Sequence, residues 1–566
     1  MSLFIILISV QVAAQNKTFQ VYQVDPLIKV LKERNYFKDR ADTLRVARGE
    51  TAAFQLVVKA KEELKHLSAT VEGISNGSFT LQKHTLRWVG YVKVGRKYKK
   101  PSKDLLHSVS DYFPDPLLDD TSWLVHPGEV QPLWLSVPIP LNTPPGVYKG
   151  TVVLSSGRGK RNKQSRTFYI KVYPVSVPET SLWVTNWMSF GPGNLAYMNN
   201  GHAVETFSPL YWDLLRKFAV MAGSHGQNMY RIYPLWLTKY TLKNGRYQFD
   251  FSNFDKTVAL FQEAGHLKRI EGGHLAWRSG KWEDPYFVEV PVQDKRPSDK
   301  PSPGNAIMDK TSGMQLVKLP LSDERAKRFL QQFLPALRDH LKQKGWLGAY
   351  IQHIADEPVD DNAASYKAIS EIVRRYLPGV KIVDAVTASK SLSGSIDIWC
   401  PVLDLFGKEY DFFKKLREQG KDLWFYTCVI PQGNYANRFI ELPLIQTRIL
   451  HWINFKYKAS GYLHWGYNFW SGFDNPLEET ARHLGMLPGG DCFIVYPGYH
   501  KLYSSIRLEA MRDGIYDYEL LHMLERKDAQ KARSIVGAVV LDFDEYDSEV
   551  VHFRKMRKKL LEALSE

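Results

Sequence analysis

Residues 346–358 read WLGAYIQHIADEP, an apolar run that ends in two adjacent acids and a proline. Its first nine residues are rich in aliphatic and aromatic side chains, which predicts a buried strand. The acids are Asp356 and Glu357, and residues 360–376 then open as a helix with acidic residues in its first turn. In a barrel of alternating strands and helices, that end of a strand carries the catalytic residues.

The adjacency of Asp356 and Glu357 has a chemical consequence. Neighbouring carboxylates repel each other, so one tends to keep its proton near neutral pH while the other stays ionised. The pair therefore offers an acid and a base from two consecutive residues. A second interpretation stays open at this point, in which the two acids only cap the helix that follows.

Length and composition limit the class of protein. A chain of 566 residues is too long for one ordinary core, so we expect two or more domains. Hydrophobic residues make up 44% and charged residues 24%, as in soluble globular proteins. The three cysteines have no paired spacing, and no histidine falls in an H-E-x-x-H pattern. The sequence therefore predicts no disulfide framework, no metal site and no cofactor.

Residues 3–12 form an apolar run that is too short to span a bilayer. The small residues Val12 and Ala14 suit cleavage after Ala14, although no Lys or Arg precedes the run. We predict a signal peptide over residues 1–15 and an exported protein, periplasmic or secreted. No later run is comparable, which argues against a transmembrane protein.

The net charge is +15, and basic residues cluster in residues 93–103, 158–166 and 554–559. No nucleic-acid-binding module accompanies these clusters, so we expect no nucleic-acid partner. They are interpreted as solvated faces, with attraction to acidic glycans or membrane surfaces as the weaker alternative.

The first part of the chain alternates short β-rich runs with turn signals, as in residues 52–58, 133–137 and 151–154. This pattern predicts a β-sandwich over residues 16–178. Its last strand is expected to stop before Pro174, with a linker over residues 174–178.

From residue 179 the pattern changes to strand followed by helix, which predicts a (β/α)8 barrel over residues 179–500. The fourth strand carries the acidic pair. The expected strands are residues 182–190, 227–233, 267–274, 347–354, 380–385, 396–402, 423–429 and 462–469. The expected helices are residues 211–221, 323–344, 360–376, 410–418 and 443–457. Residues 277–320 are expected to form a long loop over the barrel mouth, and residues 501–566 a helical segment packed on the barrel.

Four motifs, taken in order with this architecture, resemble glycoside hydrolase family 123, the retaining β-N-acetylgalactosaminidases and their relatives. They are residues 356–358 (DEP), 465–470 (WGYNFW), 491–498 (DCFIVYPG) and 507–514 (RLEAMRDG). The likeness covers nearly the whole chain after the expected signal peptide, as an N-terminal sandwich followed by a catalytic barrel.

The resemblance implies substrate-assisted catalysis with Asp356 and Glu357 as the catalytic residues. Most retaining glycosidases place a separate carboxylate nucleophile across the scissile bond from the acid. In this family the 2-acetamido oxygen of the substrate attacks instead. Asp356 would then stabilise the oxazolinium-like state, and Glu357 would protonate the leaving oxygen and later activate water.

Other residues are candidates for substrate binding, each with barrel packing or a strand-end hydrogen bond as its alternative role. Tyr426 is a candidate for a bond to the acetamido oxygen. The candidate walls for the sugar are Trp399, Trp465 and Trp470. The candidates for hydroxyl binding are Asn228, Arg231 and Asn468. Asp384 is expected to contact the sugar or to act as an alternative nucleophile. His353 is expected to be a core or supporting histidine.

Three functions stay open on the sequence. The first is an exported, exo-acting, retaining β-N-acetylgalactosaminidase acting on glycans or glycolipids. The second is a two-carboxylate glycosidase for a different sugar, with Glu357 as acid and Asp384 or another strand-end acid as nucleophile. The third is a non-catalytic glycan-binding protein, which the acidic pair argues against because binding alone needs no adjacent like charges.

Overall fold

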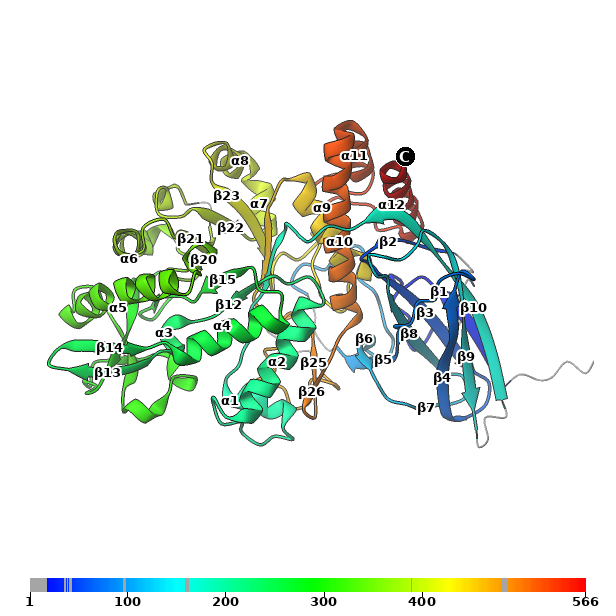
Figure 1. Ribbon diagram of the computed structural model, residues 1–566, viewed down its shortest axis with the longest axis horizontal. Helices are drawn as coiled ribbons and strands as arrows, with labels where there is room; N and C mark the ends of the chain where they lie inside the picture. Colours follow the sequence, from blue (N-terminus) through cyan, green and yellow to red (C-terminus); the bar gives the residue numbers. More distant parts are fainter. Residues whose placement is uncertain are drawn as a thin grey trace, which may run out of the picture.

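The computed structural model describes residues 18–34, 37, 39, 43–94, 98–157, 162–387, 389–479 and 487–566. They form a β-sandwich and an eight-stranded barrel, with helices of the C-terminal segment packed between the two (Figure 1). The predicted fold class is confirmed. The predicted signal peptide, residues 1–15, lies outside the described residues.

The sandwich consists of two five-stranded sheets with strand orders β1-β3-β8-β5-β6 and β2-β10-β9-β4-β7. Apolar side chains from both sheets form its core, among them Phe54, Trp88 and Phe168. Its strands are β1 (Phe19–Val24), β2 (Leu44–Arg48), β3 (Thr51–Ala60), β4 (Leu64–Ser75), β5 (Thr85–Lys93), β6 (Tyr112–Leu118), β7 (Trp123–Val125), β8 (Val130–Pro138), β9 (Gly146–Ser156) and β10 (Asn162–Ser176).

The last strand of the sandwich runs further than the sequence predicts. Strand β10 continues through Pro174 to Ser176, so the expected linker over residues 174–178 is partly strand. Pairing of β10 with β9 ends at Val172, and its register against β2 shifts between Val172 and Ser176. Pro174 lies in that irregularity, where the missing N–H of proline breaks no ladder hydrogen bond.

All eight predicted barrel strands are present and form one parallel sheet in the order β11-β24-β23-β22-β21-β20-β15-β12. Most are shorter than the apolar runs that predicted them, and the acidic pair follows the fourth. The strands are β11 (Trp183–Asn186), β12 (Met229–Arg231), β15 (Arg269–Gly272), β20 (Tyr350–Gln352), β21 (Lys381–Val386), β22 (Ile398–Pro401), β23 (Asp422–Thr427) and β24 (Gly461–His464).

The barrel closes between β11 and β12 through Asn228. Its backbone N–H donates to the Val184 carbonyl at 3.4 Å. Its side-chain oxygen accepts from the Val184 N–H at 3.0 Å, and its side-chain nitrogen donates to the Leu182 carbonyl at 3.0 Å. This amide therefore joins the two edge strands of the sheet.

Helices surround the barrel, and the five predicted ones are found close to their expected bounds. Helix α4, which sequence reasoning missed, connects β12 to β15. The helices of this layer are α1 (Pro192–Leu195), α2 (Pro209–Gly223), α3 (Pro234–Leu237), α4 (Ser252–Ala264), α5 (Glu324–Gln343), α6 (Ala363–Tyr376), α7 (Leu403–Lys408), α8 (Tyr410–Glu418) and α9 (Leu444–Lys456). Short 3-10 turns are η2 (Ala196–Met198), η3 (Pro303–Ala306), η4 (Lys310–Ser312), η5 (Leu347–Ala349), η6 (Asp360–Asn362) and η7 (Lys390–Leu392).

The segment 277–320 is not the long loop that its Pro, Gly and charged residues suggest. It carries most of an antiparallel sheet of order β16-β17-β19-β18, called here the mouth sheet. The strand Tyr286–Val292 supplies the apolar side chains that bind this sheet to the barrel core. Its strands are β16 (Ala276–Arg278), β17 (Tyr286–Val292), β18 (Lys300–Pro301) and β19 (Gln315–Leu319). Two hairpins also lie outside the barrel, β13 (Lys239–Lys243) with β14 (Arg246–Asp250), and β25 (Tyr496–Gly498) with β26 (Lys501–Tyr503).

The C-terminal segment is helical, as predicted, and consists of α10 (Ile506–Lys527), α11 (Ala529–Gly537) and α12 (Val550–Ser565). It links the sandwich to the barrel through four buried charged residues, called here the seam network: Glu50, Arg448, Asp517 and Arg557. Asp517 accepts from Arg448 Nε at 2.7 Å and from Arg557 Nε at 2.8 Å. Arg557 also donates to Glu50 of the sandwich.

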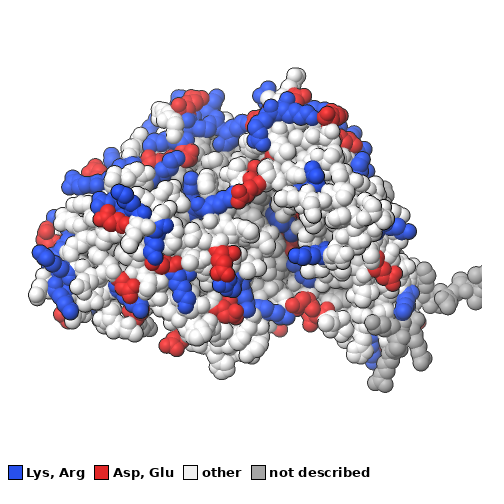
Figure 2. Space-filling model, in the orientation of Figure 1, with Lys and Arg blue, Asp and Glu red and all other residues white. Residues whose placement is uncertain are grey.

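The seam network corrects one expectation about the basic clusters. Residues 554–559 were expected to form a solvated face, but Arg557 is only 4% exposed and is paired inside the protein. On the face shown in Figure 2, Lys and Arg are interspersed with Asp and Glu. Within the described residues, no helix combines the length and apolar character needed to cross a bilayer.

Candidate active site

Asp356 and Glu357 follow β20 at the mouth of the barrel, where the strand gives way to the turn before α6. Glu357 has a φ of 43°, a left-handed conformation that is uncommon for a residue with a Cβ. Consecutive side chains of a strand point to opposite faces, and this turn breaks that alternation. Strained backbone of this kind concentrates at functional sites.

The mouth sheet and a distant strand hold the acidic pair. Arg278 of β16 donates to the backbone carbonyl of Glu357 at 2.6 Å, and the Tyr286 hydroxyl of β17 donates to that of Asp356 at 2.7 Å. The Tyr426 hydroxyl, from β23, donates to Glu357 Oε1. The backbone of the pair and the carboxyl group of Glu357 are therefore fixed by groups from three separate strands.

Both carboxyl groups have raised pKa values. Burial raises the pKa of Asp356, against the opposing charges of Arg278 and Arg231. Burial also raises the pKa of Glu357 to about 7, and the charge of Asp356 adds to that rise. Glu357 thus holds its proton up to neutral pH, which is the property that a general acid needs.

A buried histidine lies inside the barrel below the pair. His353 Nδ1 is 2.6 Å from Asp384 Oδ1, and its Nε2 is 2.7 Å from Glu271 Oε1. Burial alone would lower the pKa of His353, but the two flanking carboxyl groups raise it to about 9. His353 is fully buried, so it is a supporting histidine of the barrel interior rather than a solvent-facing acid.

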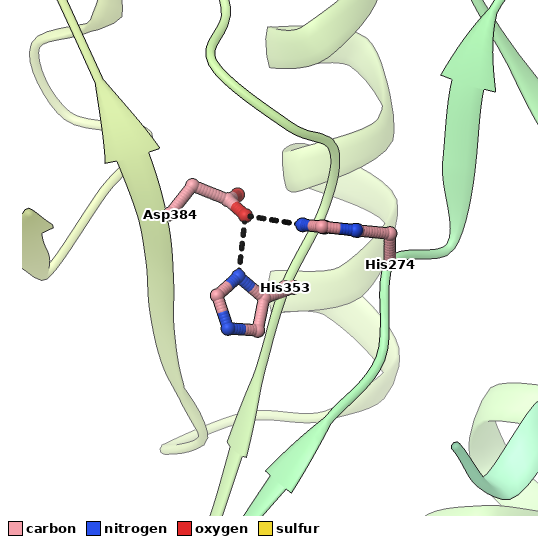
Figure 3. A group of neighbouring side chains, drawn as sticks. All are labelled: His274, His353 and Asp384. Carbon is pink, nitrogen blue, oxygen red and sulfur yellow. Dashed lines mark hydrogen bonds and ion pairs between the residues drawn. The ribbon is translucent and has the colours of Figure 1, made fainter. Parts of the chain in front are cut away.

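His274, His353 and Asp384 form the one grouping in the described residues whose donor atoms are spaced closely enough to hold a metal ion, within 4.8 Å of one another (Figure 3). Both ring nitrogens of His353, however, are already bonded to carboxylates. An imidazolium has no lone pair to offer a metal. We interpret this cluster as a hydrogen-bonded assembly rather than as a metal site.

A pocket of about 310 Å³ opens over the ends of β11, β12 and β15, and the charge of its lining residue Arg231 acts on Asp356. Its wall is aromatic: Tyr233 stacks on Trp236 with ring centroids 3.6 Å apart, and Trp236 lies parallel to Trp277 at 6.3 Å. Glu289 fixes this wall by accepting from Trp236 Nε1 at 2.8 Å. The guanidinium of Arg231 lies 5.1 Å from the Tyr233 ring. Flat apolar walls with one charged group suit a sugar ring.

Comparison with protein families decides the identity of the chain. The model of the glycoside hydrolase 123 catalytic domain matches residues 194–524, which include the barrel from β12 to β24 and most of α10. The model of the glycoside hydrolase 123 N-terminal domain matches residues 30–156, within the sandwich. The chain belongs to glycoside hydrolase family 123. The two matches follow the order of the domains in the structure.

Solved structures agree with the fold of family 123. A family 123 glycoside hydrolase from Clostridium perfringens, studied for glycolipid glycan hydrolysis, is 16% identical, with a TM-score of 0.71 and 97% of each chain covered. A family 39 glycoside hydrolase from Bacteroides cellulosilyticus WH2 is 11% identical, with a TM-score of 0.32 over 78% of this chain and 80% of that one. The second likeness is too low to support an argument. Among curated proteins, none gives a match.

Three of the residues predicted for this family 123 site lie at the barrel mouth. Tyr426 binds Glu357, and Arg231 lines the aromatic pocket. Trp465 is half-buried, with its Nε1 3.3 Å from the Asp491 carboxylate and its ring against Phe469, which also lines the pocket. Tyr426, Arg231 and Trp465 therefore stay candidates for contact with a substrate.

Two predicted tryptophans face away from the site. Trp399 is buried and packs against Phe412 and Phe413 of α8, so it fills the layer between barrel and helices. Trp470 is buried against Phe218, and its Nε1 donates to the Val495 carbonyl at 3.0 Å. Tryptophan is common in cores as well as in sugar sites, and the sequence alone does not say which face it takes.

Three residues predicted as polar contacts have side chains that are bonded inside the protein. Asn228 precedes β12 at the end away from the mouth, where it closes the barrel. Asn468 is fully buried and bonds both backbone groups of Ser189. Asp384 is fully buried, and both of its oxygens accept hydrogen bonds from protein groups. None of these three presents a free group to a sugar.

Sequence reasoning missed four residues that shape this family 123 site: Glu271, His274, Arg278 and Tyr286. Glu271 carried a usable signal, because an acid within an apolar strand must be paired when it is buried. Arg278 and Tyr286 fell in the segment taken for a loop. Their position against the acidic pair depends on how the mouth sheet folds back, which is a long-range contact.

Proposed function

We propose that this chain is an exo-acting, retaining β-N-acetylgalactosaminidase that uses the 2-acetamido group of its substrate as the nucleophile. The observation that carries the proposal is the adjacency of Asp356 and Glu357 at one strand end. A two-carboxylate retaining enzyme needs its acid and nucleophile on opposite sides of the scissile bond, about 5 Å apart. Consecutive residues that follow one strand do not easily flank a bond in this way.

The roles follow from the pair's environment. In the first step the acetamido oxygen bonds to the anomeric carbon, the glycosidic C–O bond breaks, and Glu357 gives its proton to the leaving oxygen. Asp356 accepts from the acetamido N–H and stabilises the positive oxazolinium-like state. In the second step water attacks the anomeric carbon, the bond between that carbon and the acetamido oxygen breaks to restore the acetamido group, and the water gives a proton to Glu357. Two inversions give net retention of configuration.

The substrate class rests on two further points. The similar Clostridium perfringens enzyme was studied for the hydrolysis of glycolipid glycans, which makes that class the first to test here. The aromatic pocket lined by Tyr233, Trp236 and Trp277 suits the apolar face of one sugar ring. We therefore propose a terminal 2-acetamido sugar of a glycan or glycolipid as the group that is cleaved.

The alternative two-carboxylate mechanism loses its best candidate nucleophile. Asp384 was the best candidate, but it is 0% exposed, and donors from His353, Ile354 and Tyr366 occupy its oxygens. An attacking carboxylate needs a free oxygen that faces the anomeric carbon. Asp384 has no such oxygen.

The deciding experiment compares an aryl β-N-acetylgalactosaminide with the matching aryl β-galactoside, and follows the first product anomer by NMR. We expect turnover of the acetamido sugar alone, with retention. A thiazoline mimic of the bicyclic intermediate should inhibit competitively, because it resembles the state that the site stabilises. Equal turnover of both sugars, or an inverted first product, would refute substrate assistance. Absence of hydrolysis on every aryl glycoside would favour a binding protein.

A further inference from the structure

Asp384 binds the stretch of backbone that carries the acidic pair. Its Oδ2 accepts from the backbone N–H of Ile354 at 2.9 Å and is 3.4 Å from that of Ala355. The hydroxyl of Tyr366, from α6, donates to the same oxygen at 2.5 Å. Ala355 is the residue directly before Asp356, so this carboxylate acts on the chain immediately ahead of the pair.

The contact with Asp384 supplies a hydrogen-bond acceptor to the backbone beyond the end of strand β20. Strand β20 pairs with β21 only at Ile351 and Gln352, so the next N–H groups have no partner in that ladder. A buried N–H without a partner is costly, and a side chain must supply the acceptor. The carbonyl of Ile354 is bound from the other side, by the N–H groups of Leu275 and Ala276 at 3.1 and 3.0 Å. The strand end is therefore clamped from β21 and from the start of the mouth sheet.

The other oxygen of Asp384 faces two histidines, as Figure 3 shows. Oδ1 is 2.6 Å from His353 Nδ1 and 3.7 Å from His274 Nε2. Neither ring nitrogen of His274 has a hydrogen-bond partner. His353 is bound in turn by Glu271, which accepts from Trp187 Nε1 at 2.7 Å. The carboxylate is thus held in one orientation by side chains from several strands.

We propose that Asp384 is a positioning residue: it replaces the missing strand partner at Ile354 and Ala355, and so fixes the turn that presents Asp356 and Glu357. The inference rests on the proposed function, because that function assigns the chemistry to the pair. Displacing catalytic groups by about 1 Å costs roughly 100-fold in rate. Asp384 acts through the backbone and touches neither the substrate nor the reacting atoms.

The test compares Asp384→Ala with Asp384→Asn on the aryl β-N-acetylgalactosaminide. Alanine removes the acceptor, so we expect kcat to fall about 100-fold with KM unchanged. The asparagine oxygen keeps the bonds to Ile354, Ala355 and Tyr366, while its NH2 group donates to a neutral His353. We therefore expect Asp384→Asn to recover most of the lost kcat. Equal losses in the two variants would overturn backbone positioning, as would wild-type kcat in Asp384→Ala.

Hydrogen exchange at the amides of Ile354 and Ala355 gives a readout that needs no substrate. We expect faster exchange in Asp384→Ala and wild-type protection in Asp384→Asn. If the wild type does not hydrolyse the acetamido sugar, the proposed function fails, whereas unchanged exchange in the alanine variant refutes the positioning role alone. Should Asp384→Ala not fold, Tyr366→Phe decides: loss of one donor to Asp384 is expected to lower kcat about tenfold, and wild-type kcat would overturn the proposal.

Discussion

The seam network and the acidic pair both contain buried carboxyl groups, but the surroundings shift the pKa values of these groups in opposite directions. In the seam, burial would raise the pKa of Asp517, yet the guanidinium groups of Arg448 and Arg557 lower it to about 2. At the mouth, burial raises the pKa of Glu357 to about 7, and the strongest effect of a neighbouring charge comes from another acid, Asp356. One carboxyl is held as a paired anion and the other as an acid ready to lose its proton.

This difference in pKa distinguishes a carboxyl group that stabilises the fold from one that can react. A buried carboxylate with two arginine partners is stable because its charge is compensated, and removing one partner leaves the rest uncompensated. A buried carboxyl beside a second acid lacks that compensation and stays reactive. We therefore expect changes at the mouth to remove activity and changes in the seam to remove stability. Each prediction below tests that division.

The largest effect is expected for Glu357→Gln. General acid catalysis contributes about 10²–10⁴-fold, so hydrolysis of a substrate with a poor leaving group should fall by that factor. The same variant should retain more activity on a dinitrophenyl glycoside, whose leaving group needs no proton. Steady-state kinetics on the two substrates measure the contrast, with circular dichroism as a check on folding. Wild-type rates on the poor leaving group would remove Glu357 from its role.

A substitution in the seam network should cost a comparable free energy, but it should lower only the stability of the protein and not its activity. Asp517→Asn leaves Arg448 and Arg557 without their shared anion, so we expect a loss of about 3–5 kcal/mol. Thermal and urea unfolding measure the loss, and the kcat of the remaining folded protein should equal that of the wild type. A reduced kcat in fully folded Asp517→Asn would show that the two regions are coupled, contrary to the division proposed here.

The pH dependence of kcat/KM should reflect only the pKa values of the two acids at the barrel mouth, Asp356 and Glu357. Glu357 works protonated and its pKa is about 7, so activity should fall about tenfold per pH unit above neutrality. Asp356 works ionised, and burial raises its pKa, so activity should also fall on the acid side. Glu357→Gln on the dinitrophenyl glycoside should lose the alkaline limb. An alkaline limb that persists in this variant would assign it to another group.

The smallest effect is a gain in stability. Glu357 has a folded pKa of about 7 against an ordinary value of 4.5, so the folded state binds its proton more tightly than the unfolded state. The wild type therefore loses stability as pH rises from 4.5 to 7, and Glu357→Gln does not. We expect the variant to be up to about 3 kcal/mol more stable above pH 7 and equal to the wild type below pH 4.5. A melting-temperature series against pH tests this.

The sequence predicts the barrel well because its strands are buried on both faces and appear as apolar runs. It predicts the location of Asp356 and Glu357 for the same reason, since the run ends there. The mouth sheet was missed because its strands lie among Pro, Gly and charged residues, which indicate a loop. A sheet of that kind is stabilised by packing on the barrel, and local sequence does not report such contacts.

The structure departs from the substrate-binding predictions where they depend on the direction of a side chain. Trp399 lies between Ile398 and Cys400, both of which face the barrel interior, so alternation places it against α8. The alternation of side chains along the strand therefore decides the direction of Trp399, and using it requires knowing which neighbouring residue faces the barrel interior. The contacts of Asp384 could not be predicted from its own strand, because its hydrogen-bond partners Ile354 and Tyr366 come from separate elements.

The contacts of α12 also set an order of events during biosynthesis. Arg554 pairs with Asp25 at 2.9 Å and Arg557 with Glu50, and both acids belong to the sandwich. Domains fold as units while the chain emerges from the ribosome, with the N-terminal one first. The sandwich must therefore form while Asp25 and Glu50 still face water, and it waits for the barrel and then α12 to be translated. Docking of the two domains is thus a late step, completed by Arg554 and Arg557, which are translated long after Asp25 and Glu50.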